Sequence, residues 1–321
     1  MGCRLLLLLS ALCALLLLLL LCLGLLLRAD SDLTLQWAER RGRCPERELP
    51  GMVVWVTGAS GGIGEELAYQ LSKLGVSLVL SARREHELER VKRKCLDNGT
   101  VKEKDILILP LDLTNRSSHE VATNAILQEF GRIDILINNG GRAQCSLIVD
   151  TNMDVFKELI ELNYLGTVSL TKCVLPHMIQ RKQGKIVTMN SLVGIIPGTA
   201  CSGYGASKHA LRGFFNSLYI ELGEYPDIII SNIYPGPVRS NIMKNALTEE
   251  ITKAFGHDFK YIHTLATSRC ARLILIAMAN NLKEVWISGQ SFLLRAYLWQ
   301  YMPSLACWIS RVFQKQLRKI L

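Results

Sequence analysis

The chain has 321 residues, a formal charge of +9 and a pI near 9.1, and 49% of its residues are hydrophobic. This length accommodates one large domain or two small ones. The basic residues are scattered rather than gathered in one stripe, which argues against a nucleic-acid partner and leaves a membrane surface or an anionic cofactor. The ten cysteines include no CxxC pair and the six histidines show no ligand spacing, so we expect neither a disulfide framework nor a metal site.

A long apolar segment lies near the N-terminus. Leu5 to Leu27 comprises 23 residues without a charge, which is long enough for a helix to cross a bilayer core of about 30 Å. A cleaved signal peptide has a shorter apolar core of about 7–15 residues and a small-residue cleavage site, and neither is evident here. We therefore expect residues 1–28 to be an uncleaved transmembrane anchor and residues 29–50, which are polar, to be a linker.

The charges around this segment bear on its orientation. One arginine precedes the apolar run, and five follow it closely: Arg28, Arg40, Arg41, Arg43 and Arg47. By the positive-inside rule this distribution favours a cytosolic catalytic domain. Asn98 and Asn115 begin glycosylation sequons, which would be used only in the lumen. We adopt the cytosolic orientation as the prediction and keep the luminal one as the alternative.

The first half of the chain predicts a nucleotide site. Residues 52–57 are an apolar run typical of a strand, a glycine-rich turn follows, and a helical pattern begins at Glu65. Glycines in this setting let the backbone approach a pyrophosphate, and the helix N-terminus presents free N–H groups to its charge. The residues expected to contact the cofactor here are Gly58, Ser60, Gly61, Gly62, Ile63 and Gly64.

The second predicted strand, residues 76–82, ends in Arg83 and Arg84 and carries no carboxylate. An acidic residue at this place binds the ribose 2′-hydroxyl of NAD, whereas arginine accommodates the 2′-phosphate of NADP. The sequence therefore predicts NADPH/NADP⁺, with Arg83 as the main contact and Arg84 as its helper. A third strand at 105–110 leads to Asp112, which we expect to accept a hydrogen bond from the adenine amino group.

Strands and helices continue to alternate along the chain. A helix at 117–130 precedes a fourth strand at 133–137, which leads into an Asn-Asn-Gly-Gly turn. We assign Asn138, the first residue of this turn, to the cofactor. Later helices are expected at 154–181 and 267–281, and later strands at 184–191, 227–233 and 284–287. This alternation indicates a parallel sheet of about seven strands covered on both faces, within one domain at residues 51–290.

The second half carries the candidate catalytic groups. Ser191 ends the fifth strand, and Tyr204 and Lys208 follow it on a helix. Residues four apart share one helix face, so the phenol and the ammonium can meet. A nearby cation favours the phenolate and lowers the tyrosine pKa, and a phenol tuned in this way can act as a general acid or base.

Together these motifs resemble those of the short-chain dehydrogenases/reductases, in order and in spacing, over residues 50–290. The motifs are Thr57-Gly58-x-x-x-Gly62-x-Gly64, Asn138-Asn139-Gly140-Gly141, Asn163, Ser191, Tyr204-x-x-x-Lys208 and Pro235-Gly236. The resemblance implies a Rossmann-type doubly wound fold and a hydride transfer involving a nicotinamide cofactor. The flanking segments are similar to those of a vertebrate microsomal member, which implies the endoplasmic reticulum membrane and NADPH-dependent reduction of steroid, retinoid and xenobiotic carbonyls.

The resemblance also implies a role for each catalytic residue. Tyr204 would donate the proton to the carbonyl oxygen, and Ser191 would hydrogen-bond that oxygen as the substrate-binding group. Lys208 would tune Tyr204 and, with it, contact the nicotinamide ribose. Asn163 would hold a water molecule in the proton relay. Pro235 and Gly236 would contact the cofactor.

Two departures from the family pattern bear on the cofactor. Gly61 stands where a serine is common, and Gly140 replaces the usual alanine. Both changes are expected to loosen the cofactor pocket and to weaken NADPH binding at most.

The tail at residues 291–321 mixes aromatic and basic residues, which suits a membrane interface. A substrate lid or a homodimer contact is an equal alternative for this tail. Two other functions stay open: an NAD(P)⁺-dependent alcohol oxidation, and a non-catalytic nucleotide-binding scaffold at the membrane.

Overall fold

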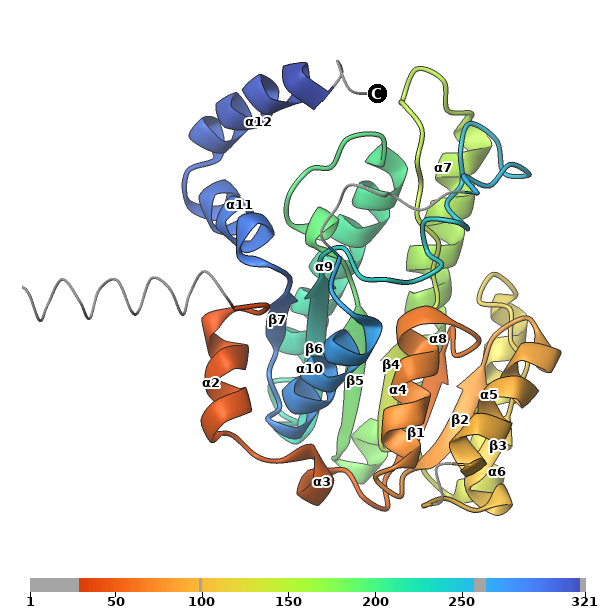
Figure 1. Ribbon diagram of the computed structural model, residues 1–321. Helices are drawn as coiled ribbons and strands as arrows, with labels where there is room; N and C mark the ends of the chain where they lie inside the picture. The colour runs from red at the N-terminus through yellow and green to blue at the C-terminus, as the bar shows by residue number, and fades with distance from the viewer. Residues whose placement is uncertain (1–28, 98–99, 257–263, 318–321) are drawn as a thin grey trace, which may run out of the picture.

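The computed structural model describes residues 29–97, 100–256 and 264–317. Its centre is a seven-stranded sheet in which every neighbouring pair of strands is parallel, in the order β3-β2-β1-β4-β5-β6-β7 (Figure 1). The strands are β1 (Val53–Thr57), β2 (Ser77–Ser81), β3 (Ile106–Ile108), β4 (Ile135–Asn138), β5 (Gly184–Met189), β6 (Ile228–Pro235) and β7 (Glu284–Ile287). The predicted doubly wound α/β fold is therefore confirmed.

Both faces of the sheet are buried, which explains the continuous apolar runs of its strands. In β1, for example, Val54 and Val56 belong to one core and Val53 and Trp55 to the other. The first core packs under α4 (Gly62–Ser72), α5 (Glu85–Asp97) and α10 (Thr267–Ala279). The second packs under α6 (His119–Phe130), α8 (Thr167–Arg181) and α9 (Ser202–Glu221).

The predicted helix at 154–181 is continuous but changes its winding. It consists of α7 (Met153–Ile160), a π-helical stretch η3 (Glu161–Gly166) and α8. Such π turns inside α-helices are rare and frequently occur at functional sites. Here the turn contains Asn163, which is fully buried.

The predicted linker at 29–50 is not a free connection. It forms α2 (Leu33–Arg41) and α3 (Pro45–Glu48), and Leu35 and Ala38 of α2 are buried in the first core, which also contains α10. Arg269 of α10 donates to both oxygens of Asp30, at 2.7 and 3.0 Å. The polar composition of the segment concealed this packing, because only a few apolar side chains make the contact.

The chain ends in two helices, α11 (Gln290–Tyr301) and α12 (Pro303–Leu317), on the side of β7. Within the described ranges, no helix is both long enough and apolar enough to span a membrane. The predicted anchor at residues 1–28 lies outside these ranges, as does the sequon residue Asn98, whereas Asn115 is exposed.

Candidate active site

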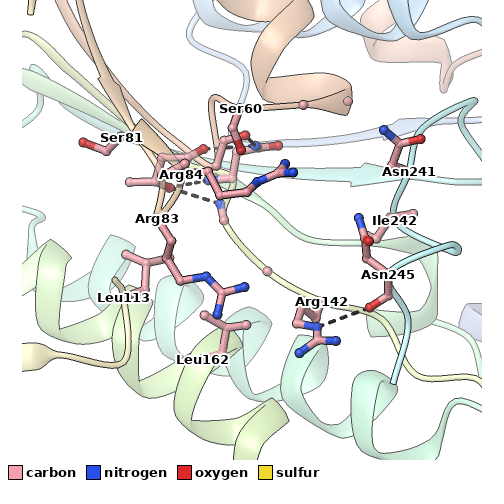
Figure 2. Close-up of a pocket in the computed structure, with 18 of the residues that line it drawn as sticks. Ser60, Ser81, Arg83, Arg84, Leu113, Arg142, Leu162, Asn241, Ile242 and Asn245 are labelled. Atoms are coloured by element: carbon pink, nitrogen blue, oxygen red, sulfur yellow. Dashed lines mark hydrogen bonds between the residues drawn. The ribbon is translucent and has the colours of Figure 1, made fainter. Parts of the chain in front are cut away.

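A cavity of about 450 Å³ lies beyond the carboxyl ends of the first four strands (Figure 2). Its walls come from the glycine turn after β1, the ends of β2 and β4, the loop after β3 and the segment after β6. The predicted cofactor residues that line this cavity are Gly58, Ser60, Gly61, Gly62, Ile63, Arg83, Arg84 and Asp112. The cofactor residues predicted from the first three strands thus converge on one cavity, except for Gly64.

The glycine turn has the backbone shape that a phosphate cradle requires. Gly58 and Gly62 have positive φ angles of 65° and 59°, which side-chain-bearing residues rarely adopt. A Cβ on Gly58 would also lie 2.9 Å from the Cα of Gly140. Helix α4 begins next to the cavity, and its N-cap Gly61 has no side chain to occupy the first N–H groups. These donors are therefore available to a dinucleotide pyrophosphate.

Gly64 and Asn138, which were both predicted to bind the cofactor, have structural positions instead. A Cβ on Gly64 would lie 2.4 Å from the carbonyl oxygen of Gly58, so this glycine allows the helix to pack against the turn. Asn138 is buried outside the cavity and its Nδ2 donates to Thr171 Oγ1 at 3.0 Å. Its neighbour Asn139 lines the cavity. Successive side chains at a strand end point in opposite directions, which explains why Asn139 lines the cavity and Asn138 does not.

Hydrogen bonds fasten the β4 turn to the glycine turn. Thr57 Oγ1 accepts from the backbone N–H groups of Asn139 and Gly140, at 3.0 and 3.1 Å. The Asn139 side chain donates to the carbonyl oxygens of Thr57 and Gly58, at 3.0 and 3.2 Å. Thr57 and Asn139 therefore position the floor of the cavity, although sequence reasoning assigned neither of them to the site.

The two departures from the family pattern have different surroundings. A Cβ on Gly61 would meet no atom within 4 Å, so a serine would fit there without displacing any protein atom. A Cβ on Gly140 would lie 2.5 Å from Leu113 Cδ1. The volume that an alanine methyl would occupy is filled by the Leu113 side chain, so the geometry does not indicate a looser pocket at Gly140.

Positive charge gathers on one side of the cavity. Arg83 and Arg84 line it as predicted, and Arg142 joins them from the loop after β4 (Figure 2). Burial lowers the pKa of Arg142, and nearby Arg83 lowers it further. Arg142 Nε donates to the carbonyl oxygen of Asn245 at 3.2 Å. Arg142 could not be identified from the sequence, because it belongs to no motif and reaches the cavity only through the course of its loop.

Asp112 lines the cavity, and one of its carboxylate oxygens is already hydrogen-bonded within the protein. Its Oδ1 accepts from the backbone N–H of Thr114 at 3.0 Å and from the Thr114 hydroxyl at 2.8 Å. This pattern stabilises the turn after β3. The residue is thus held in place at the cavity wall, where the sequence placed it.

Ser191, Tyr204 and Lys208 converge at the end of β5. The Ser191 hydroxyl hydrogen-bonds with the Tyr204 phenol, and it also lies 3.5 Å from the carbonyl oxygen of Pro235. Lys208 Nζ donates to the carbonyl oxygen of Met189 at 2.7 Å and lies 5.8 Å from the centre of the Tyr204 ring. The three predicted groups therefore form one cluster, with Pro235 at its edge.

The electrostatics of this cluster differ from the expectation. Burial raises the pKa of Tyr204 to about 12, and the hydrogen bond with Ser191 opposes that rise only in part. Burial also lowers the pKa of Lys208 to about 8. The expected lowering of the Tyr204 pKa by Lys208 is not found, because desolvation of the phenolate outweighs the attraction of a cation several ångströms away. At neutral pH both groups carry their protons.

Asn163 holds the backbone beside this cluster. Its Oδ1 accepts from the Arg142 N–H at 2.9 Å, and its Nδ2 donates to the Arg142 carbonyl at 2.9 Å and to Ser207 Oγ at 3.0 Å. Both amide hydrogens are thereby used. The geometry makes Asn163 a positioning residue for the Arg142 loop and for α9.

Gly141 connects the cavity with the catalytic cluster. It lines the cavity, and a Cβ placed on it would lie 2.9 Å from Asn163 Oδ1 and 3.9 Å from Lys208 Nζ. A dinucleotide that enters at the arginines can therefore extend past Gly141 to Lys208 and Tyr204. Gly236 lies outside the cavity, where a Cβ would collide with Ser288, so its role here is close packing beside Ser191.

Apolar side chains surround the Tyr204 ring. Ala143 and Ala246 are buried against it, and partly buried residues complete the cluster: Cys145, Val193, Cys201, Met243 and Phe255. Two of these residues, Met243 and Phe255, come from the segment after β6, whose Ser240 and Asn245 line the dinucleotide cavity. An apolar wall next to a proton donor suits a lipophilic substrate.

Comparisons with known proteins agree with this geometry. The family model described as short chain dehydrogenase matches residues 52–251. The chain is 69% identical over 316 residues to the Homo sapiens protein Dehydrogenase/reductase SDR family member 7, covering 98% of this chain and 93% of that protein. It is 68% identical over 310 residues to the Mus musculus protein of the same name, covering 97% and 91%.

Solved structures share the fold. A short chain dehydrogenase/reductase from Burkholderia phymatum in complex with NAD matches with a TM-score of 0.70 at 21% identity, over 80% of this chain and 96% of that one. An alcohol dehydrogenase from Thermococcus sibiricus complexed with 5-hydroxy-NADP matches with a TM-score of 0.64 at 23% identity, over 74% and 96%. At these identities the likeness supports the fold alone.

Proposed function

Because the chain belongs to the short-chain dehydrogenases/reductases, we propose that it is an NADPH-dependent reductase of lipophilic carbonyl compounds such as steroids, retinoids and xenobiotics. The observation that carries this proposal is the buried Tyr204 phenol. It keeps its proton at neutral pH, bonds to Ser191 and lies in an apolar cluster next to the dinucleotide cavity. A carbonyl reduction needs such a donor.

Each protein group has a task in this reduction. NADPH held by the residues of the cavity would, when bound, supply the hydride for the carbonyl carbon. Ser191 donates a hydrogen bond to the carbonyl oxygen, where negative charge grows in the transition state. Tyr204 transfers its proton to that oxygen. Lys208 stays protonated below its pKa of about 8 and holds positive charge beside the tyrosine as its proton leaves.

NADPH is proposed over NADH because of charge. Arg83, Arg84 and Arg142 line one cavity, and among the described residues that line it Asp112 is the single carboxylate. Arginine binds phosphate oxygens through paired N–H donors, whereas an NAD site usually presents an acid to the ribose hydroxyls. The same site can run in the direction of alcohol oxidation, since the chemistry is reversible and the cofactor ratio sets its direction.

Membrane attachment is part of the proposal. The apolar run at residues 5–27 would anchor the chain in the endoplasmic reticulum membrane, with the catalytic domain in the cytosol. A luminal domain would instead allow glycosylation at the exposed Asn115. Loss of apparent mass after glycosidase treatment of the expressed protein would reverse the proposed orientation.

NADPH oxidation with a panel of steroid, retinal and quinone carbonyls tests the activity. We expect Tyr204→Phe to lower kcat by about 10²- to 10⁴-fold, the usual contribution of a general acid. Tyr219→Phe is the matched control, because Tyr219 lies on the same helix but is exposed. Turnover that survives the Tyr204 change would disprove the assigned mechanism, and no turnover with any compound would favour the scaffold alternative.

A further inference from the structure

We propose that the apolar surface of α11 and α12 rests on the bilayer in which residues 5–27 are anchored, so that it is a second, peripheral membrane contact. This inference depends on the membrane attachment proposed above. The first of these helices begins next to Ala29, the first described residue after the apolar run, and several apolar and aromatic side chains of both helices are exposed.

The two helices display an unusual share of exposed apolar side chains. The residues are Leu294, Tyr301, Met302, Leu305, Trp308 and Val312. Leu305, Trp308 and Val312 follow one another at spacings of three and four, which places them on one face of α12. Trp308 is 64% exposed and Tyr301 is 78% exposed. Exposed apolar side chains gathered on two helices that contact each other are typical of an interaction site.

The tail is positively charged, which suits contact with an anionic phospholipid surface. After Glu284 the chain has no Asp or Glu, and it carries the basic residues Arg295, Arg311, Lys315, Arg318 and Lys319. Each basic residue near an anionic membrane surface adds to the attraction between the chain and the membrane. Exposed tryptophan and tyrosine beside basic residues are typical of helices that lie in the headgroup region.

The position of α11 next to Ala29 favours the bilayer as the partner that covers the exposed apolar side chains of α11 and α12. Gln290, the first residue of α11, donates through Nε2 to the carbonyl oxygen of Ala29 at 3.0 Å. Ala29 follows the apolar run by only two residues. Ser31 pairs with Ile287 immediately before α11. The point where the chain leaves the proposed anchor is thus fastened to the base of α11, which keeps both helices close to the membrane surface.

A second apolar segment lies at the same end of the molecule. The loop before α7 exposes Leu147, Ile148 and Val149, and this loop and α12 both project beyond the carboxyl ends of the strands (Figure 1). A planar bilayer can contact two separated elements at one end, whereas a short peptide partner would cover only one of them. The catalytic cluster lies at this end as well.

The proposed contact is continuous with the active site. Leu293 and Ala296 of α11 pack in one cluster with Leu192, Ile195 and Ile196, the loop that follows Ser191. Contact of α11 and α12 with lipid would therefore hold the Ser191 loop next to the bilayer. Lipophilic carbonyl compounds dissolved in the membrane would then reach the Tyr204 cluster without crossing bulk water.

Quenching of tryptophan fluorescence by brominated lipid tests this contact. The full chain is reconstituted in phosphatidylcholine–phosphatidylserine vesicles with and without bromine on the acyl chains. We expect brominated lipid to quench the wild type, and Trp308→Phe to lose most of the quenched component. Adding Val121→Trp to that variant is the matched control, because position 121 is exposed on α6, which lies on the β3 side of the sheet, whereas α11 and α12 lie on the β7 side. The tryptophan added at position 121 should not restore the lost quenching.

The outcomes separate the two proposals. Failure of the wild type to float with the vesicles would contradict both the attachment and this contact. Flotation with equal bromine quenching in the wild type and Trp308→Phe would disprove the contact and leave the attachment standing. Protection of Trp308 from acrylamide without bromine quenching would show that a second copy of the chain covers α12, which would also overturn the inference.

Discussion

The dinucleotide cavity and the Tyr204 cluster adjoin each other, but their ionisable groups differ in exposure to water. Arg83 and Arg84 are exposed at the cavity rim, where water solvates them. Tyr204 and Lys208 are buried, and burial raises the pKa of the first to about 12 and lowers that of the second to about 8. The cavity can thus bind an anion at little desolvation cost, while the cluster keeps a proton ready for transfer.

This difference separates the effects expected from mutation. Changes in the cluster should alter the rate of the chemical step, because its groups act on the developing charge in a desolvated place. Changes at the cavity rim should alter the affinity for the cofactor and the preference for NADPH over NADH. The rim arginines would contact the cofactor in the ground state as well as in the transition state.

Ser191→Ala should have the largest of these effects. Removing one donor to the developing oxyanion typically lowers kcat by about 10²- to 10³-fold. Because Ser191 lies outside the dinucleotide cavity, the Kd for NADPH should stay unchanged. Steady-state kinetics and cofactor fluorescence titration measure the two quantities. A large rise in the Kd with little change in kcat would contradict the separation.

Arg83→Ala should act on the cofactor alone. Hydrogen bonds to charged groups contribute about 1.5–3 kcal/mol, so NADPH affinity should fall by roughly 10- to 100-fold while NADH affinity stays the same. Arg84→Ala should have a smaller effect in the same direction. Arg93→Ala is the matched control, because Arg93 is exposed on α5 outside the cavity. Equal losses for both cofactors would refute the assignment to the 2′-phosphate.

The pH profile should report Lys208. Its pKa of about 8 means that it is charged below pH 8 and neutral above, while Tyr204, with a pKa of about 12, keeps its proton throughout this range. We expect kcat/KM for carbonyl reduction to fall by about tenfold per pH unit above pH 8. Lys208→Met should show a low and flat profile. A flat wild-type profile up to pH 10 would mean that the lysine charge is not needed.

Gly140→Ala should have the smallest effect, on stability rather than catalysis. Its Cβ would come within 2.5 Å of Leu113 Cδ1, and overpacking of this kind costs about 1–3 kcal/mol. Adding Leu113→Ala should recover part of that loss, which a double-mutant cycle of denaturant unfolding measures. Strict additivity of the two changes would show that Leu113 does not fill the place of the missing methyl.

The sequence predicted the parts of the site that lie in short, local patterns. The pattern of strand, glycine turn and helix was sufficient to predict the positions of Gly58 and Gly62, because positive φ angles and close backbone approach favour glycine. The spacing of Tyr204 and Lys208 on one helix, and Ser191 at a strand end, likewise follow from local geometry. Asn138 and Asn139 were harder to separate, because a strand end points neighbouring side chains in opposite directions.

Other features depend on contacts between distant segments. Arg142 enters the cavity because Asn163, 21 residues later, holds its backbone. Ser240 and Asn245 form a cavity wall, although the segment after β6 has no pattern that relates it to the glycine turn. Helix α2 packs near α10 through Leu35 and Ala38, and α11 meets Ala29 through Gln290.

Local sequence patterns were sufficient to predict the doubly wound fold, the backbone shape of the glycine turn and the position of Tyr204, since each depends on backbone geometry or on residues within one turn of structure. The protonation of Tyr204 and Lys208 depends instead on the tertiary structure, because burial is set by side chains from several elements at once. The tertiary structure also brought Arg142 to the cavity and fastened the start of the catalytic domain to the final helices, through contacts whose partners no local pattern could identify.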